Sequence, residues 1–257
     1  MKRRPSRHPL PWSYHAVIGV LRPMLMGLTR RDWSGGEHLP EEGGFIVAAN
    51  HYSEVDPFTM AHFLVDHGHP PFFLAKSNLF QVPGLGHALR HLEQVPVYRA
   101  TSQAGDALEA ARAALAEGKV IGITPEGTLT RDPDLWPMKG KSGVGRLALT
   151  SRAPVIPLAQ WGAQEVLDRY ARRPGNVLRR PVQHVRVGPP VDLTDLYERA
   201  DDPRAHAEAT RRVMAAITDL LSQIRGEDPP ARPYDMARDG SARPRPGGRR
   251  RGSKRDS

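Results

Sequence analysis

A histidine and an aspartate five positions apart are the pair in this sequence best suited to acid–base chemistry. His51 and Asp56 lie just after the apolar run at residues 45–49. Histidine has an unperturbed pKa that suits proton transfer near neutral pH. A tight turn, held by the amide of Asn50, would bring the carboxylate back onto the imidazole to fix its tautomer and stabilise an imidazolium. The alternative is a surface histidine beside a helix-capping aspartate.

Two more groups of side chains that could take part in a reaction follow apolar runs further along the chain. Arg99 ends the run that begins at Val95, and Glu126-Gly127-Thr128 comes directly after the run at residues 120–124. Strand ends at one edge of an open α/β sheet converge on a single crevice. A base, a cation and an acid beside a glycine turn suit transfer onto a hydroxyl of a phosphorylated acceptor.

Apolar runs and amphipathic stretches alternate along the chain without a repeat, which predicts an α/β fold with helices on both faces of a sheet. We expect strands at residues 45–49, 72–76, 95–99, 120–124, 155–159 and 184–187. We expect helices at 11–30, 58–65, 103–117, 143–151 and 201–224, and a loop over the site at 129–141.

A chain of 257 residues fits one such domain, which we place at residues 33–226. Before it, residues 1–32 form a basic, amphipathic helical segment, in which Arg22-Pro23 interrupts the longest apolar stretch. The longest apolar stretch of this segment is too short to span a membrane, which takes about 20 apolar residues. It could lie in a membrane interface or pack on the domain. Residues 227–257 predict a disordered basic tail.

The net charge of +9 belongs to the two ends of the chain. Residues 1–8 carry +4 and residues 241–257 carry +6, which leaves about −1 for the rest. Such ends attract anionic lipid or nucleic acid, or they serve only as solvated tails. The chain has no cysteine, which excludes disulfides, thiolate metal sites and a cysteine nucleophile. No spacing matches a metal motif, so neither a metal nor a cofactor is expected.

Four blocks of residues, in order, resemble the glycerolipid (lysophosphatidic acid) acyltransferase family, over residues 36 to about 162. The blocks are Asn50-His51-x4-Asp56, Val95-Pro96-Val97-Tyr98-Arg99, Pro125-Glu126-Gly127-Thr128 and Pro154-Val155-Ile156-Pro157. The resemblance implies a single α/β domain with a mixed β-sheet flanked by helices, preceded by an N-terminal membrane-associating helical segment.

The resemblance also implies an O-acyltransferase that uses acyl-CoA or acyl carrier protein as co-substrate. The acceptor would be a lysophospholipid, chiefly 1-acylglycerol 3-phosphate, and the product phosphatidic acid. His51, oriented by Asp56, would take the proton of the acceptor hydroxyl, whose oxygen attacks the thioester. Because a thiolate leaves readily, no nucleophile of the enzyme is needed, in agreement with the lack of cysteine.

The same resemblance assigns residues to the acceptor. Arg99 would bind the acceptor phosphate through charge-assisted hydrogen bonds, and Glu126, Gly127 and Thr128 would shape the acceptor pocket. The family often continues the third block with arginine or serine, whereas here Leu129 follows. A second phosphate contact is therefore expected from a later basic residue, Lys141.

Other functions fit parts of the sequence. A related enzyme could acylate glycerol 3-phosphate, another lysolipid or a glycolipid, and a thioester hydrolase could use the same base. A non-catalytic protein could bind polyanions through the basic ends alone. For the acyltransferase, we expect a peripheral protein at the cytoplasmic face of the plasma membrane, bound to its anionic surface, with no specific nucleic acid partner.

Overall fold

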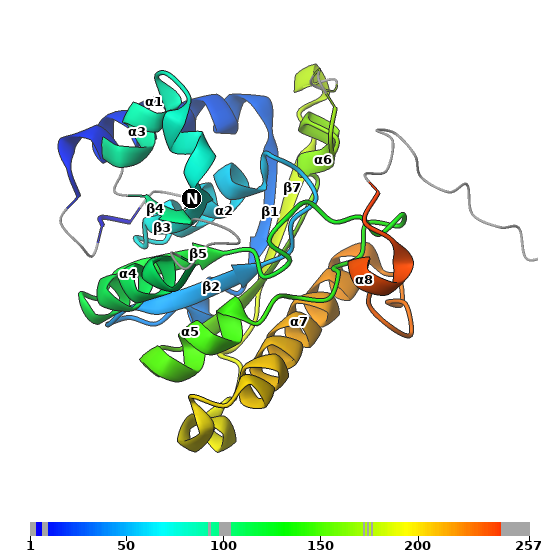
Figure 1. The fold of residues 1–257 in the computed structure, drawn as a ribbon. Coiled ribbons are helices and arrows are strands. Elements are labelled where there is room, and N and C mark those ends of the chain that lie inside the picture. Colours follow the sequence, from blue (N-terminus) through cyan, green and yellow to red (C-terminus); the bar gives the residue numbers. More distant parts are fainter. Residues whose placement is uncertain are drawn as a thin grey trace, which may run out of the picture.

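The computed structural model describes residues 4–6, 10–91, 94–97, 104–171, 173, 175 and 177–242. In these residues, seven strands form one sheet in the order β1-β7-β6-β2-β5-β3-β4 (Figure 1). The strands are β1 Arg30–Ser34, β2 Phe45–Ala49, β3 Pro71–Lys76, β4 Val95–Val97, β5 Val120–Ile123, β6 Val155–Trp161 and β7 Val182–Val187.

The sheet is mixed, as the family resemblance implied. Strands β2, β3, β4, β5 and β6 run parallel, β7 runs antiparallel to β6, and β1 runs parallel to β7. Strand β2 lies in the middle, with Ile46 opposite Ile121 of β5 and Val155 of β6. All residues of β2 are buried, because helices cover both faces of the sheet at this point.

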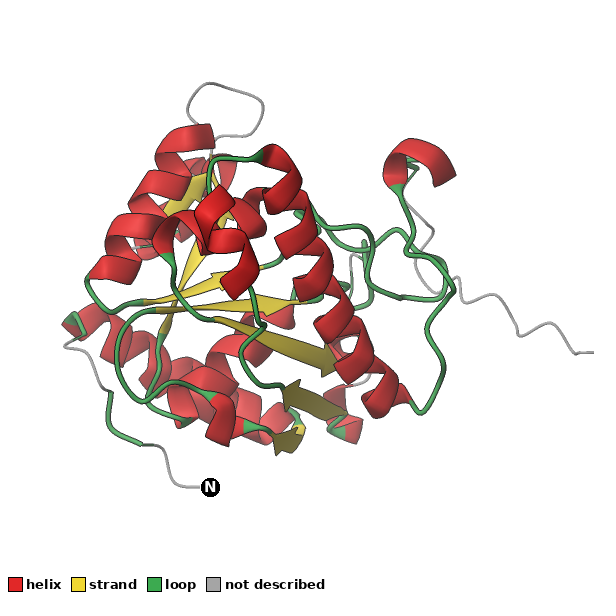
Figure 2. Ribbon diagram, turned by 90° about the horizontal axis from the view of Figure 1, so that it is seen from below, coloured by secondary structure: helices red, strands yellow, loops and turns green. Residues whose placement is uncertain are grey.

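The helices form a layer on each side of the sheet (Figure 2). On one side, Phe45 and Val47 of β2 pack against Met60 and Phe63 of α2. On the other side, α4, α5 and α7 share one apolar cluster with the opposite face of β2. The α-helices are α1 Trp12–Leu28, α2 Asp56–Asp66, α3 Leu85–His91, α4 Ala104–Ala116, α5 Gly143–Ser151, α6 Ala163–Val166, α7 Pro203–Arg225 and α8 Met236–Asp239.

Helix α1 is continuous through Pro23, the residue at which the apolar stretch is interrupted in the sequence. Proline removes one backbone hydrogen bond from a helix, but contacts with the domain hold α1 up to this point. The Tyr14 hydroxyl donates to the carbonyl of Pro71 at 2.7 Å, and Arg22 Nε lies 2.6 Å from Asp66 Oδ1. The helix therefore packs on the domain. No helix in the described part of the chain has the length and apolarity to cross a membrane.

Strand β1 follows α1 directly and had no counterpart in the predicted elements. Its residues Arg30 to Asp32 fall inside the segment 1–32 that the sequence assigned to N-terminal helices. Asp32 lies opposite His184 of β7, and Arg31 binds Asp66 at 3.2 Å. The sheet therefore begins at residue 30, and only α1 and the residues before it precede the sheet.

Candidate active site

The end of β2 is fixed to the end of β6 by the side chain of Asn50. Its Nδ2 donates to the carbonyl of Gln160 at 3.0 Å, and its Oδ1 accepts from the Gln160 backbone N–H at 2.9 Å. The Gln160 amide in turn donates to the Asn50 carbonyl at 3.1 Å, and the Tyr52 hydroxyl donates to the Gln160 carbonyl. Asn50 therefore anchors the strand end from which His51 departs, in addition to starting the turn.

His51 and Asp56 form a hydrogen-bonded pair. Nδ1 of His51 lies 3.0 Å from Oδ2 of Asp56, and the Asp56 side chain is fully buried. The same Oδ2 accepts the backbone N–H groups of Tyr52 at 2.7 Å and Ser53 at 2.8 Å. The turn thus holds the carboxylate against the imidazole, as the spacing predicted. With Nδ1–H donated to Asp56, the ring presents Nε2 as its basic nitrogen.

Glu126 supports His51 from the end of β5. Its Oε1 accepts the backbone N–H of His51 at 3.0 Å, and its Oε2 accepts the backbone N–H of Met138 at 2.9 Å. The residue is buried, and this burial raises the pKa of Glu126 to about 8 against the effect of the two backbone donors. The carboxyl group thus contacts backbone at two separate points of the site, and a role toward the acceptor stays a prediction.

The glycine after Glu126 lets a lysine approach the site. Gly127 has φ +69°, and a Cβ built on it would lie 3.3 Å from Nζ of Lys141. The Lys141 backbone N–H donates to the Pro125 carbonyl at 2.9 Å. The lysine side chain therefore passes over the glycine turn, which half-buried Thr128 follows in sequence. The structure brings the His51–Asp56 pair to one edge of the sheet, together with Glu126, Gly127, Thr128 and Lys141.

Arg99 lies outside the described residues, as does Tyr98. Strand β4, the run that leads to it, adds to the sheet beside β3, with Val95 opposite Leu74. The contact of Arg99 with an acceptor phosphate stays a prediction from the sequence. The basic end at residues 243–257 also lies outside the described part of the chain.

The segment at residues 129–141 has no helix or strand and crosses the site, in agreement with the expected loop. The Thr130 backbone N–H donates to the His51 carbonyl at 2.7 Å, and the Thr130 hydroxyl donates to the Trp136 carbonyl at 2.8 Å. The guanidinium of Arg225, at the end of α7, lies 4.2 Å from the centre of the Trp136 ring. Helix α7 thereby holds this loop in place.

Two residues of the site, Gln160 and Arg169, were not predicted from the sequence. Gln160 is fully buried at the end of β6, and Arg169 is buried with Nη1 donating to the carbonyl of Thr130 at 3.2 Å and to that of Asp132. Both residues bind backbone groups across long stretches of chain. For Gln160, the one signal available in the sequence was a polar amide directly after the apolar run at residues 155–159, as Asn50 follows the run at residues 45–49.

Replacing Glu126 with glutamine is expected to flatten the pH dependence of stability. Because the pKa is 4.5 in the reference state and about 8 in the fold, the folded protein keeps a proton that the unfolded chain releases. The stability that this proton contributes is fully present below pH 4.5 and is lost as the pH rises to about 8. Urea unfolding across this range should show a falling free energy of unfolding for the unmodified protein.

Glu126→Gln should show a smaller slope over the same range, because it cannot ionise. Its free energy of unfolding at low pH should also be lower by about 1 kcal/mol, since the amide NH2 cannot accept one of the two backbone N–H groups. Equal slopes in the two proteins would show that Glu126 does not titrate in this range.

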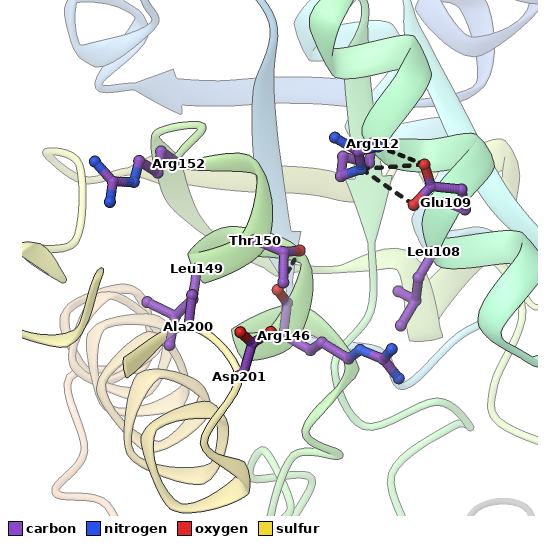
Figure 3. A pocket seen from close by; sticks show the side chains of 9 residues that line it. All are labelled: Leu108, Glu109, Arg112, Arg146, Leu149, Thr150, Arg152, Ala200 and Asp201. Carbon is purple, nitrogen blue, oxygen red and sulfur yellow. Dashed lines mark hydrogen bonds and ion pairs between the residues drawn. The ribbon is translucent and has the colours of Figure 1, made fainter. Parts of the chain in front are cut away.

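A cavity of about 390 Å³ opens between α4 and α5 (Figure 3). It lies on the face of the sheet opposite α2, and Arg112, Arg146 and Arg152 contribute to its wall. Glu109 binds Arg112 within it, with Nε 3.1 Å from Oε2. None of the predicted site residues that the structure describes lines this cavity, so it is separate from the His–Asp pair.

Comparison with known proteins identifies the family of the chain. The profile of the family described as "Acyltransferase" matches residues 30–161, which is just over half of the chain and includes His51, Asp56 and Glu126. A 1-acyl-sn-glycerol-3-phosphate acyltransferase of Bacillus subtilis (strain 168) is 26% identical over 187 residues, which cover 73% of this chain and 82% of that protein. One of Borreliella burgdorferi is 29% identical over 126 residues, 49% of this chain and 48% of that protein.

The fold has a counterpart among solved structures. The crystal structure of the 1-acyl-sn-glycerophosphate (LPA) acyltransferase, PlsC, from Thermotoga maritima superposes with a TM-score of 0.61 at 21% identity. The match covers 84% of this chain and 83% of that one. The family profile, the relatives and the shared fold lead to one conclusion. The chain belongs to the acyltransferase family, in the group that resembles the lysophosphatidic acid acyltransferases.

Proposed function

We propose that this acyltransferase transfers a fatty acyl group from an acyl thioester to the free hydroxyl of 1-acylglycerol 3-phosphate, which gives phosphatidic acid. The observation that carries the proposal is the His51–Asp56 pair at 3.0 Å, set beside the Gly127 turn and the Lys141 ammonium. The pair supplies a base, and the lysine supplies a cation for a phosphate. The names of the relatives in Bacillus and Borreliella support this acceptor.

The reaction needs one proton acceptor and no covalent intermediate with the enzyme. Nε2 of His51 takes the proton of the acceptor hydroxyl while its oxygen attacks the thioester carbonyl. Asp56 stabilises the imidazolium that forms. As the tetrahedral intermediate collapses, a C–O bond replaces the C–S bond and the imidazolium returns its proton to the thiolate. General base catalysis of this kind contributes about 10²- to 10⁴-fold.

The acyl donor in the proposal is a thioester of coenzyme A or of acyl carrier protein. Both present the same reacting group, so the chemistry of the His–Asp pair suits either. Turnover with matched acyl chains on the two carriers separates them. The preferred carrier gives the larger kcat/KM.

The test of the function is an acceptor panel with one labelled acyl thioester. We expect labelled phosphatidic acid from 1-acylglycerol 3-phosphate, and less product from glycerol 3-phosphate, other lysolipids and glycolipids. Labelled free fatty acid formed at full rate without any acceptor would identify a thioester hydrolase instead. Removal of the basic end at residues 243–257 should leave turnover on a soluble acceptor intact, whereas a polyanion-binding protein would lose its function.

Replacing Lys141 with alanine is expected to raise the KM for the lysophospholipid about tenfold and to leave the KM for the thioester within about twofold. The reason is the loss of one charge-assisted hydrogen bond to the phosphate. Lys139→Ala is the matched control, because Nζ of Lys139 binds Asp235 at 2.9 Å on the surface. Equal effects of Lys141→Ala on both substrates would remove the lysine from the phosphate role.

We further propose that the protein binds peripherally to the anionic cytoplasmic face of the plasma membrane through the outer face of α1. Three large apolar side chains of α1 are exposed there: Trp12 by 79%, Val20 by 67% and Met24 by 46%. Phe58 of α2 is also exposed, and Phe58 and Met24 line one cavity. Exposed apolar patches of this kind mark interaction surfaces, and a lipid acceptor places the enzyme at a membrane.

Val20→Asp is expected to weaken binding to vesicles of anionic lipid at least about tenfold, since it removes the burial of one aliphatic side chain and adds a like charge. Ala215→Asp makes the same change of charge at an exposed position of α7, on the other side of the sheet. This control should bind as the unmodified protein does. Co-sedimentation with vesicles measures both. Equal loss of vesicle binding in the two variants would show that the added negative charge, and not the loss of the Val20 side chain, weakens binding.

A further inference from the structure

Leu178 is the most exposed large apolar side chain in the described part of the chain. It is 89% exposed and lies in the short helical turn η3 (Val177–Arg179), which follows α6. A single apolar side chain on a surface is ordinary, so Leu178 indicates a partner only if its surroundings do so as well. Three properties of the surroundings do: the turn is fixed to the fold, it adjoins an apolar surface, and it is basic.

Three hydrogen bonds attach the turn to the end of α1 and the start of β1. Nη2 of Arg180 donates to the carbonyl of Met26 at 2.9 Å. Nε of Arg30 donates to the carbonyl of Arg180 at 3.1 Å, and the Arg30 backbone N–H donates to the carbonyl of Pro181 at 3.0 Å. Figure 1 shows the segment that follows α6 beside the end of α1, at the upper right. The turn therefore presents Leu178 to solvent from a fixed position.

The turn adjoins the apolar surface of α1. The backbone N–H of Gly175, two residues before the turn, donates to the carbonyl of Val166 at 2.8 Å. Val166 lines one cavity together with Met24 and Phe58, which are exposed apolar residues of α1 and α2. The exposed residues of α1 include no Asp, Glu, Lys or Arg. Leu178 thus extends an uncharged surface that begins with α1.

The charge around Leu178 is positive. Arg173, Arg179 and Arg180 are exposed on the same segment, and Arg30 is exposed beside it. Residues 169–182 contain five arginines and no aspartate or glutamate. An apolar side chain among arginines suits an anionic lipid surface, since the side chain enters the acyl region while guanidinium groups bind lipid phosphates. Nucleic acid offers the matching charge but no apolar phase for the leucine.

We propose that this turn surface, formed by Arg30, Arg173 and residues 177–180, docks on an anionic lipid bilayer. Leu178 inserts among the acyl chains, and the arginines bind the lipid phosphates. The contact is additional to that of α1 and rests on the proposed peripheral binding. A single helix on a bilayer leaves the protein free to rotate about the axis of that helix. The second contact removes this freedom and gives the enzyme one orientation on the membrane.

Co-sedimentation of the full chain with vesicles of phosphatidylcholine and phosphatidylglycerol, without substrate, tests the surface. Leu178→Gln should bind at least about tenfold more weakly, because it loses the burial of one aliphatic side chain. Leu178→Phe keeps an apolar side chain and should bind as the unmodified protein does. The side chain is almost fully exposed, so neither change should disturb the fold. Unchanged binding of Leu178→Gln would overturn the proposal.

Arg179→Gln tests the charge. It should weaken binding to the same vesicles about fivefold, and binding to vesicles of phosphatidylcholine alone should not change. Arg199→Gln is the matched control, because Arg199 is exposed at the end of the turn Thr194–Arg199, on the side of the sheet covered by α5 and α7. A loss in Arg179→Gln with none in Leu178→Gln would identify a polyanion site without insertion and would overturn the proposal.

Val20→Asp separates the two membrane contacts. Loss of binding in Val20→Asp with none in Leu178→Gln would show that α1 alone holds the membrane. Loss in Leu178→Gln with none in Val20→Asp would support the turn surface and remove α1 from this role. Absence of vesicle binding by the unmodified protein would overturn both contacts. Acyl transfer is tested apart from them, because Leu178→Gln should leave turnover on a soluble acceptor unchanged.

Discussion

His51→Ala is expected to lower turnover by about 100- to 10,000-fold, the contribution of a positioned general base. Half-buried His51 makes its side-chain hydrogen bond to Asp56, and its backbone, not its ring, binds Glu126 and Thr130. The alanine variant keeps those backbone bonds, so the fold should survive. Single-turnover rates with a labelled thioester measure the effect, and circular dichroism checks the fold.

The chain offers a matched control for this experiment. His184 and Asp32 form a second His–Asp pair, with Nδ1 2.7 Å from Oδ2, on strands β7 and β1. His184→Ala removes an imidazole–carboxylate contact of the same kind away from Glu126 and Lys141. Its turnover should stay within about twofold of the unmodified enzyme. Wild-type activity in His51→Ala would refute the assignment of the base.

Asp56→Asn is expected to lower turnover by about 10- to 100-fold while the fold remains intact. Oδ2 of Asp56 accepts two backbone N–H groups besides Nδ1 of His51, so the asparagine must place its carbonyl oxygen at that position. The tautomer of His51 is then preserved, and only the negative charge opposite the imidazolium is lost. Loss of a hydrogen bond to a charged group costs about 1.5–3 kcal/mol.

The double variant makes this prediction specific. If His51 and Asp56 act as one unit, His51→Ala with Asp56→Asn should be no slower than His51→Ala alone. A loss of turnover in the double variant equal to the product of the two single losses would show that Asp56 acts on the reaction independently of the imidazole. Asp56→Ala is expected to be less stable than Asp56→Asn, because it leaves the backbone N–H groups of Tyr52 and Ser53 without their acceptor. Each unsatisfied group lowers the free energy of unfolding by about 1–3 kcal/mol.

Local patterns predicted the elements that have strong apolar periodicity. The helix at residues 143–151 agrees with α5 at both ends, and the helix at 201–224 is found as α7, Pro203–Arg225. Helix α7 begins at a side-chain cap, Asp202, and ends at Gly226 with φ +62°, and both signals are local in sequence. The central strands followed from apolar runs for the same reason.

The N-terminal elements were less predictable because distant residues decide them. Strand β1 is a polar stretch, Arg30–Ser34, without alternation, and its pairing with β7 supplies the order that its own sequence lacks. Helix α1 continues past Pro23 because contacts such as Arg22–Asp66 outweigh a local preference to break. Neither partner can be identified from the neighbouring sequence.

The site was predictable where its geometry is local. The His51–Asp56 contact spans five residues, and the turn between them is encoded there. The contacts of Glu126 are not local, since its oxygens reach backbone N–H groups on both sides of it in the chain. Gln160 escaped notice because its role is to pair with Asn50 across 110 residues. Such contacts exist only after the sheet has formed.

The pairing of β1 with β7 has a consequence for how the chain is made. Asp32 and its partner His184 are 152 residues apart. Strand β1 is therefore synthesised first and cannot pair until β7, the last strand, has been synthesised. A chain halted before Val182 would contain all seven predicted site residues and still lack the neighbour of β1. The predicted site residues are therefore synthesised before the strand with which β1 pairs, and this edge of the sheet forms last.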